Sequence, residues 1–350
     1  MKTRGLSPRL TIMSLILGLI IMLSMAACGQ KTEPAATTAA PTPQTFNLKF
    51  VDMYTPGAKD AMTGDDLINL ITKNTNNKVQ ITVYHGTLGK ATEFLTMLDG
   101  GACDIANLTP GNYPNQFPLE AGAELPVLGF TSRTQRIDAM WELFNKGYFT
   151  SLAKYKVLAF NPTPGMNFYF AKPVKTVADM KGLRLRASDP NMLNLIGKIG
   201  GVPTPIASPD VYMSLQKGVI DGAYTAYEQV LQSKWYEVTK YTLWNPLSQG
   251  CMYIVMKKSV WDSMPPDVQL GINQAINDYK YAYLARVQDA DRTAVPELEK
   301  NGVNVSYLSA ADLAILKDAA ATISKDWVTA QGQKGQDLMN ELAKIVARYQ

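Results

Sequence analysis

The sequence predicts an α/β fold of two similar lobes, and three observations support this prediction. Strand and helix patterns alternate along the chain, the same order of elements occurs twice, and a short signature recurs at the same place in both passages. Strand–helix alternation is typical of a mainly parallel sheet with helices on its faces. The chain has 350 residues, which is more than one hydrophobic core usually holds.

Alternation of apolar and polar residues predicts strands, and apolar residues at helical spacing predict helices. In the first passage we expect strands at 46–51, 79–83 and 103–106, with helices at 67–71 and 94–98 between them. In the second passage we expect strands at 182–187, 202–207 and 219–221, with helices at 191–199 and 209–216. The strand at 202–207 is the weakest of these, because two prolines interrupt it.

The recurring signature reads L-x-x-G-x-x-D-x-A. It runs from Leu98 to Ala106 and again from Leu215 to Ala223. In each copy a helix can end on the glycine, which tolerates a left-handed cap, and the chain then enters a strand with an aspartate. Chance similarity is the alternative, but the matching element order favours two related lobes. Ligands of open α/β sheets bind outside the carboxyl ends of the strands, so we expect a cleft between the lobes.

The N-terminus has the pattern of a secretory signal peptide. Three basic residues, Lys2, Arg4 and Arg9, precede a largely apolar stretch at 10–25, and small residues lead to Cys28. The stretch is shorter than the roughly 20 apolar residues of a membrane-spanning helix, although an uncleaved anchor is the alternative. Met25-Ala-Ala-Cys28 resembles a bacterial lipobox, which implies cleavage after residue 27 and lipid on Cys28. Residues 28–45 lack large apolar side chains, so we expect a flexible linker.

Charge and cysteine content limit the possible partners. The formal charge is +4, and three of the positive charges lie in the predicted signal peptide, so the mature chain is nearly neutral. No block of Lys and Arg stands out, so the sequence indicates neither nucleic-acid binding nor a polybasic membrane patch. Cys103 and Cys251 remain after Cys28. They could form a disulfide, and two buried free thiols are the alternative.

The sequence contains none of the common catalytic motifs. The chain has one histidine, His85, and no motif of a zinc protease, a nucleophile elbow or a phosphate-binding loop. A metal site would need a cluster of His and Cys ligands. We therefore expect a protein that binds and does not catalyse, with no metal and no cofactor. A lipid-anchored hydrolase is the weaker alternative, and it would have to use His85.

Two further segments make the sequence recognisable. Residues 179–186 read D-M-K-G-L-R-L-R, and residues 211–222 read V-Y-M-S-L-Q-K-G-V-I-D-G. Both resemble motifs of the solute-binding proteins of tripartite ATP-independent periplasmic (TRAP) transporters, the DctP-type family. The V-Y-H-G-T-L-G segment at 83–89 is also similar to that family. The resemblance extends from about residue 46 to beyond residue 266.

The resemblance implies a two-lobed fold like that of periplasmic binding proteins, with a ligand cleft between the lobes and a long helix that spans both. It places lobe I at 46–163 and 250–291, and lobe II at 164–249 and 292–350. It also implies capture of a small organic carboxylate and delivery to integral membrane permease subunits, in the periplasm or on the cell surface. A receptor for a membrane sensor is an alternative that the sequence leaves open.

The resemblance also suggests ligand-binding residues. The arginine at the place of Arg186 binds the ligand carboxylate in the family, and a guanidinium can form two parallel hydrogen bonds to a carboxylate. Many relatives carry a second arginine in the preceding strand and an asparagine after the D-G pair. This chain has Asn167 in that preceding strand and Thr225 in place of the asparagine.

Compared with many relatives, these segments have fewer cationic and more aromatic residues. This difference suggests a ligand with a single carboxylate on an apolar or aromatic body. The candidate residues beside Arg186, Asn167 and Thr225 are then Tyr54, Tyr224, Tyr227 and Glu228. Ordinary packing of the aromatic residues and a solvated Glu228 are the alternatives.

Overall fold

The structure is a computed structural model, and it describes residues 44–53 and 64–349. The predicted signal peptide, the lipidation candidate Cys28 and the candidate Tyr54 lie outside these residues. Thr45–Gln350 form one compact unit. Two separate sheets occur in this unit, as the two-lobe prediction requires, and we call them sheet A and sheet B.

Sheet A has five strands in the order β2-β1-β3-β10-β4. Strands β1, β2 and β3 run parallel, whereas β10 is antiparallel to both β3 and β4. The strands are β1 (Phe46–Asp52), β2 (Val79–His85), β3 (Ile105–Leu108), β4 (Tyr155–Pro162) and β10 (Cys251–Lys257). The helices of this part are α2 (Asp65–Asn74), α3 (Phe94–Gly100), α4 (Arg133–Asn145) and α8 (Lys258–Asp262).

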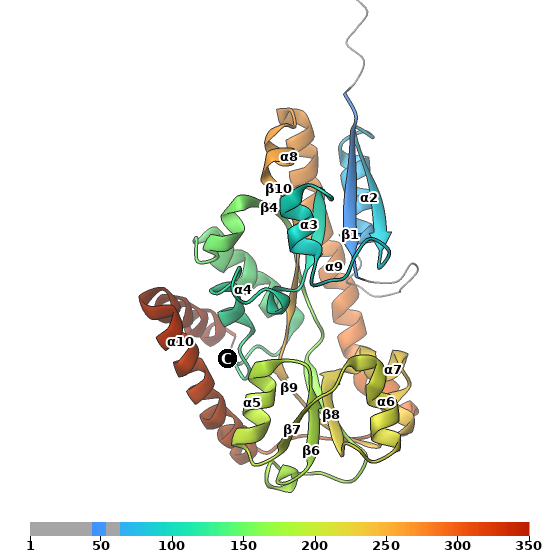
Figure 1. Ribbon diagram of the computed structural model, residues 1–350, viewed down its shortest axis with the longest axis vertical. Helices are drawn as coiled ribbons and strands as arrows, with labels where there is room; N and C mark the ends of the chain where they lie inside the picture. The colour runs from blue at the N-terminus through green and yellow to red at the C-terminus, as the bar shows by residue number, and fades with distance from the viewer. Residues whose placement is uncertain (1–43, 54–63, 350) are drawn as a thin grey trace, which may run out of the picture. The chain divides into compact units, whose positions relative to one another are not determined.

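Sheet B has six strands in the order β11-β9-β5-β8-β6-β7. The strands are β5 (Met166–Phe170), β6 (Arg184–Ala187), β7 (Val202–Pro205), β8 (Gly222–Ala226), β9 (Tyr241–Ser248) and β11 (Asn304–Ser306). The helices here are α5 (Pro190–Lys198), α6 (Ser208–Gln216) and α7 (Tyr227–Gln232). Helix α5 lies on one side of the sheet and α6 and α7 lie on the other (Figure 1).

The two sheets have the same plan. In sheet A the order β2-β1-β3 is followed by the antiparallel β10, and in sheet B the order β7-β6-β8 is followed by the antiparallel β5. The antiparallel strand comes from the other half of the chain in both cases, because β5 follows β4 and β10 follows β9. The chain therefore crosses from sheet A to sheet B at 162–166 and returns to sheet A at 248–251.

The recurring signature has the same structural role in both sheets. Gly101 and Gly218 have φ of +79° and +67°, the left-handed conformation expected at the helix ends. The Asp104 carboxylate accepts a hydrogen bond from the Lys49 N–H at 2.8 Å, and the Asp221 carboxylate accepts one from the Arg184 N–H at 2.8 Å. Each aspartate thus lies just before a strand and connects it to the parallel strand beside it: Asp104 connects β3 to β1, and Asp221 connects β8 to β6.

Two predicted strands begin later than expected. The strand predicted at 103–106 starts at Ile105, and the one predicted at 219–221 starts at Gly222. The prediction for 219–221 was wrong because this segment bends before β8 begins, and the Asp221 carboxylate accepts the hydrogen bond from the Arg184 N–H. The remaining predicted strands and helices of both passages are confirmed, with ends shifted by a few residues.

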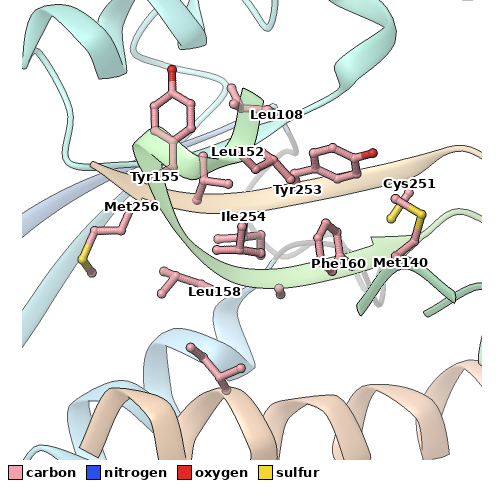
Figure 2. Close-up of a cluster of buried hydrophobic side chains, with 14 of the residues drawn as sticks. Leu108, Met140, Leu152, Tyr155, Leu158, Phe160, Cys251, Tyr253, Ile254 and Met256 are labelled. Carbon is pink, nitrogen blue, oxygen red and sulfur yellow. The ribbon is translucent and has the colours of Figure 1, made fainter. Parts of the chain in front are cut away.

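The apolar core of sheet A is centred on β4 and β10, which are neighbours. Phe160 and Tyr253 lie opposite each other on these strands, and their rings meet edge to face with centroids 5.1 Å apart. Figure 2 shows Met140 from α4 and Cys251 beside them. Cys103 and Cys251 are both buried free thiols, and burial raises the pKa of the Cys103 thiol to about 12.

Two long helices pack against both lobes. Helix α9 (Pro266–Lys300) contributes its first part, including Tyr279 and Tyr283, to the core of sheet A and its end, including Leu298, to a core beneath sheet B. Helix α10 (Ala310–Ala347) begins against sheet B and ends against sheet A, although 292–350 was assigned to lobe II by the sequence. Gly332, at φ +62°, interrupts its helical backbone. Within the described ranges no helix is long and apolar enough to cross a membrane.

Candidate functional site

Arg186 lies near the carboxyl end of β6 and is 4% exposed. Its Nε donates a hydrogen bond to the Ile206 carbonyl at 2.8 Å, and its Nη1 donates to the Tyr224 carbonyl at 3.4 Å. Burial lowers the pKa of the Arg186 guanidinium. No acidic side chain among the described residues forms an ion pair with it. A buried cation held only by backbone carbonyls is suited to receive an anion.

Asn167 and Thr225 lie on the same face of sheet B as Arg186. Asn167 on β5 is directly opposite Thr225 on β8, and Ala223, two residues before Thr225, is opposite Arg186 on β6. Because side chains two residues apart in a strand point to the same face, the three candidates share one face of the sheet. Asn167 is fully buried, its Nδ2 donates to the Gly165 carbonyl at 3.1 Å, and its Oδ1 has no hydrogen-bond partner in the described part of the chain.

Tyr224 lies on the opposite face. It precedes Thr225 in β8, so its side chain alternates to the side where α5 packs. Its ring lies 5.0 Å from the Phe168 ring, and its hydroxyl is 2.7 Å from the Ser248 Oγ. Burial raises the pKa of this phenol above its usual range. Tyr224 is therefore not grouped with Arg186, and its role in binding remains a prediction.

Tyr227 and Glu228 open α7, immediately after β8, and both contact Arg133. The Arg133 Nη2 donates to the Tyr227 hydroxyl at 3.2 Å and to the Glu228 Oε1 at 3.4 Å. Asp291 on α9 accepts from the same Nη2 at 2.6 Å and from Nε at 3.1 Å. Burial alone would lower the pKa of Arg133, but the hydrogen bond and charge of Asp291 raise it above the usual range.

Sequence reasoning missed Arg133. This residue begins α4 and is 1% exposed, and its Nη1 has no hydrogen-bond partner among residues 44–53 and 64–349. Arg133 and Arg136 stand one helical turn apart, on the same face as the apolar Ile137 and Met140. Two arginines on an apolar helix face require buried partners, and this signal could have identified the position.

His85, the residue that a hydrolase would require, is the last residue of β2. Its Nε2 lies 3.3 Å from the Asp65 Oδ1, and its Nδ1 lies 3.9 Å from the Asp52 Oδ2. The groups beside the imidazole are therefore carboxylates. Across the described part of the chain, no three or more His, Cys, Asp and Glu side chains form a group that could hold a metal ion.

The family described as bacterial extracellular solute-binding protein, family 7, or DctP, matches residues 59–331. The chain belongs to this family. It is a solute-binding protein of a TRAP transporter, a transport receptor that works with a membrane permease, and the resemblance seen in the sequence is confirmed. DctP proteins of this kind are not enzymes, so the hydrolase alternative is set aside.

Relatives of this DctP-family protein cover nearly the whole chain. The sialic acid-binding periplasmic protein SiaP of Vibrio cholerae is 22% identical over 335 residues, which are 93% of this chain and 97% of SiaP. A TRAP periplasmic solute-binding protein from Desulfovibrio salexigens has a similar structure, with a TM-score of 0.80, 25% identity and coverage of 87% and 97%. The two-lobed α/β fold with long helices is thereby confirmed.

A second similar structure comes from an unidentified marine microbe. It is a TRAP solute-binding protein specific for aromatic acid ligands, in complex with 3-hydroxybenzoate. Its TM-score is 0.76 and its identity is 23%, with 87% of this chain and 99% of that chain covered.

Proposed function

We propose that this TRAP solute-binding protein captures a small organic acid and that Arg186 binds the carboxylate of that acid. The observation that carries the proposal is the buried Arg186 guanidinium, whose partners among the described residues are two backbone carbonyls. A guanidinium has five N–H donors, so donors remain for an incoming carboxylate. An anion would also offset the cost of burying this charge.

The acid would carry one carboxylate on an aromatic or apolar body. Asn167 and Thr225 share the Arg186 face and bring no further cation, which favours a monocarboxylate over a dicarboxylate. The unpartnered Asn167 Oδ1 would accept a hydrogen bond from a hydroxyl or amine of the solute. Tyr227 would supply an aromatic wall, and Glu228 would orient the polar group of the solute. The aromatic-acid specificity of the marine relative supports this choice, whereas sialic acid binding by SiaP represents the competing class.

A thermal-shift screen of residues 45–350 against small carboxylates tests the proposal. A solute present at 100 times its Kd stabilises the native state by about 2.7 kcal/mol, which raises the Tm visibly. We expect an aromatic or branched monocarboxylate to do this. A preference for a dicarboxylate or for sialic acid would overturn the proposed solute class, even if Arg186 still proved necessary.

Two neighbouring arginines provide a matched pair of variants. Arg186→Gln should abolish the shift, whereas Arg184→Gln should keep it, because Arg184 is exposed and pairs with Asp221 at 2.9 Å. Arg186→Lys keeps the charge but loses the paired geometry, so we expect binding to weaken roughly tenfold or more. Circular dichroism would confirm that each variant is folded. Full binding by folded Arg186→Gln would refute the assigned role.

We further propose that the two lobes comprise 46–163 with 250–291 and 164–249 with 292–350, where the end of α10 reaches back to the core of sheet A, and that they close on the solute. The two chain crossings and the two lobe-spanning helices support a hinge between them. Solution scattering should then show a smaller radius of gyration when the identified solute is added. An unchanged radius at saturating solute would contradict closure.

The lipid anchor is also a proposal. The charged start, the apolar stretch and the Met25-Ala-Ala-Cys28 sequence support cleavage after residue 27 and acylation of Cys28. Mass spectrometry of the protein from the native membrane should find a diacylglyceryl Cys28 at the mature N-terminus. Cys28→Ser should release the body from the membrane fraction, and a full-length uncleaved chain would contradict the proposal.

A further inference from the structure

Four neighbouring strands of sheet B each have an exposed lysine at the same edge. Lys181 precedes β6, Lys198 ends α5 before β7, and Lys217 follows α6 before β8. Lys172 follows β5, which runs antiparallel to β8 and so ends at the edge where β8 begins. We call Lys172, Lys181, Lys198 and Lys217 the lysine row.

Hydrogen bonds between the connecting segments hold the row in place. The Gly182 N–H donates to the Gly200 carbonyl at 2.8 Å, which joins the segments that carry Lys181 and Lys198. Asp221, which follows Lys217, donates its N–H to Arg184 and accepts from the N–H of Ala171, the neighbour of Lys172. Adjacent strands lie about 4.8 Å apart, so the row spans about 15 Å along the sheet edge.

The lysine row has no ion pairs with the described acidic residues. The acids near it have other partners: Asp221 pairs with Arg184, and the Asp179 carboxylate accepts from the N–H groups of Lys175 and Thr176. The corresponding edge of sheet A differs. There Lys78 pairs with Asp267 at 2.6 Å and Lys258 pairs with Asp262 at 2.7 Å.

A helix dipole explains only half of the row. Lys198 and Lys217 lie at helix C-termini, where a positive side chain is favoured. Lys172 lies in a connecting segment with no such field to offset, and Lys181 caps a 3-10 helix of only three residues (Ala178–Met180), which is too short for an appreciable dipole. Two large apolar side chains are also exposed beside the row, Val202 at 46% and Val219 at 50%. Unpaired lysines interleaved with exposed valines form a surface suited to an interface between water and lipid.

We propose that the lysine row, with Val202 and Val219, binds an anionic phospholipid surface. The ammonium groups would contact headgroup phosphates, and the valines would enter the boundary of the acyl region. A folded acidic partner would favour arginine forks and aromatic anchors, whereas flexible lysines suit mobile headgroups. Arg186 lies toward the other end of β6 from Lys181, so this contact leaves the proposed solute site free. The inference does not rest on the identity of the solute.

Vesicle binding tests this proposal. Residues 45–350, the compact unit that holds both sheets and lacks the proposed anchor, would be sedimented with vesicles of phosphatidylcholine, or with about a third phosphatidylglycerol added. We expect binding to the anionic vesicles only, and a decrease as salt is raised. Each lysine should contribute about fivefold, so Lys181→Gln, Lys198→Gln and Lys217→Gln together should weaken binding about a hundredfold.

A matched triple variant on α10 separates this surface from a general effect of charge. Lys317→Gln, Lys325→Gln and Lys334→Gln remove three exposed lysines of the same type and should leave vesicle binding nearly unchanged. The circular dichroism spectrum and the Tm of each triple variant should match those of the wild type, which shows that each is folded. Equal losses in the two triples, or no preference of the wild type for anionic vesicles, would overturn the proposal.

Discussion

The Arg133 guanidinium on α4 binds the Asp291 carboxylate on α9, with Nη2 2.6 Å from Oδ1 and Nε 3.1 Å from both oxygens. The same Nη2 donates to the Tyr227 hydroxyl. Helix α4 packs in the core of sheet A, whereas Tyr227 packs in a core of sheet B. One buried side chain therefore connects both lobes with the helix that spans them.

We expect Arg133→Met to lower the free energy of unfolding by about 2–3 kcal/mol, because hydrogen bonds between charged groups are lost and Tyr227 loses its donor. Urea unfolding followed by circular dichroism would measure this. The double variant with Asp291→Asn is the control, since the two losses should not add if the residues act as a pair. Strictly additive losses would show that the contact contributes nothing.

A second prediction concerns Gly122, which packs against Trp327 of α10. A Cβ added at Gly122 would lie 2.3 Å from two ring atoms of Trp327. The ring is held in place, because its Nε1 donates to the Pro118 carbonyl at 3.3 Å. We expect Gly122→Ala to lower the free energy of unfolding by about 1–3 kcal/mol through overpacking, measured in urea.

A smaller partner should remove the effect of the added methyl group. In a Trp327→Leu background, Gly122→Ala should cost much less than in the wild type, although Trp327→Leu alone is itself destabilising. A neutral Gly122→Ala in the wild-type chain would mean that the ring moves freely, contrary to the contact with Pro118.

The plan of the fold was predictable where local residues set the structure. Gly101 and Gly218 end their helices in the left-handed conformation, and this requirement is visible in a single signature. The strand starts were not predictable, because Asp104 and Asp221 pair through their side chains before the backbone ladder begins. The exchange of β5 and β10 between the sheets depends on partners distant in sequence, which periodicity cannot identify.

The candidate site, like the fold, was predictable from local residues but not where it depends on distant partners. Residue spacing could have separated Tyr224 from Thr225, since adjacent residues of a strand face opposite sides. The resemblance named Arg186, Asn167 and Thr225, and the register brings them to one face, but their roles in binding await experiment. The two arginines on the apolar face of α4 indicate that Arg133 has a buried partner, but they do not identify it, because Asp291 lies 158 residues away.

A third prediction uses the Arg184–Asp221 pair. Hydrogen bonds from Arg184 hold the pKa of the Asp221 carboxyl below its usual range, which is about 3.9 in an unfolded chain. A lowered folded pKa stabilises the native state above about pH 3.9, and this stabilisation is lost as the pH falls through the folded pKa. Asp221→Asn should therefore cost roughly 1 kcal/mol near neutral pH and less in strong acid. Urea titrations at both pH values measure the difference, and a loss that is the same at both would contradict the electrostatic account.

The last prediction concerns Glu124, a carboxyl whose pKa is raised and not lowered in the native state. Burial raises the pKa of the Glu124 carboxyl to about 7, and the Asp189 charge adds to this while Arg136 opposes it. In the unfolded chain the pKa is about 4.3, so ionisation costs more in the native state, and stability falls as the pH rises from about 4.3 to about 7. Glu124→Gln removes this cost and can still accept the Cys251 N–H bond, which is 3.0 Å long in the wild type.

We therefore expect Glu124→Gln to match the wild type near pH 4 and to exceed it in free energy of unfolding above about pH 7, by on the order of 1–3 kcal/mol. Glu142→Gln provides the contrast, because hydrogen bonds from Arg348 and Lys146 lower the pKa of Glu142. That variant should lose stability where Glu124→Gln gains it. If the difference between Glu124→Gln and the wild type stays constant with pH, burial does not control the ionisation of Glu124.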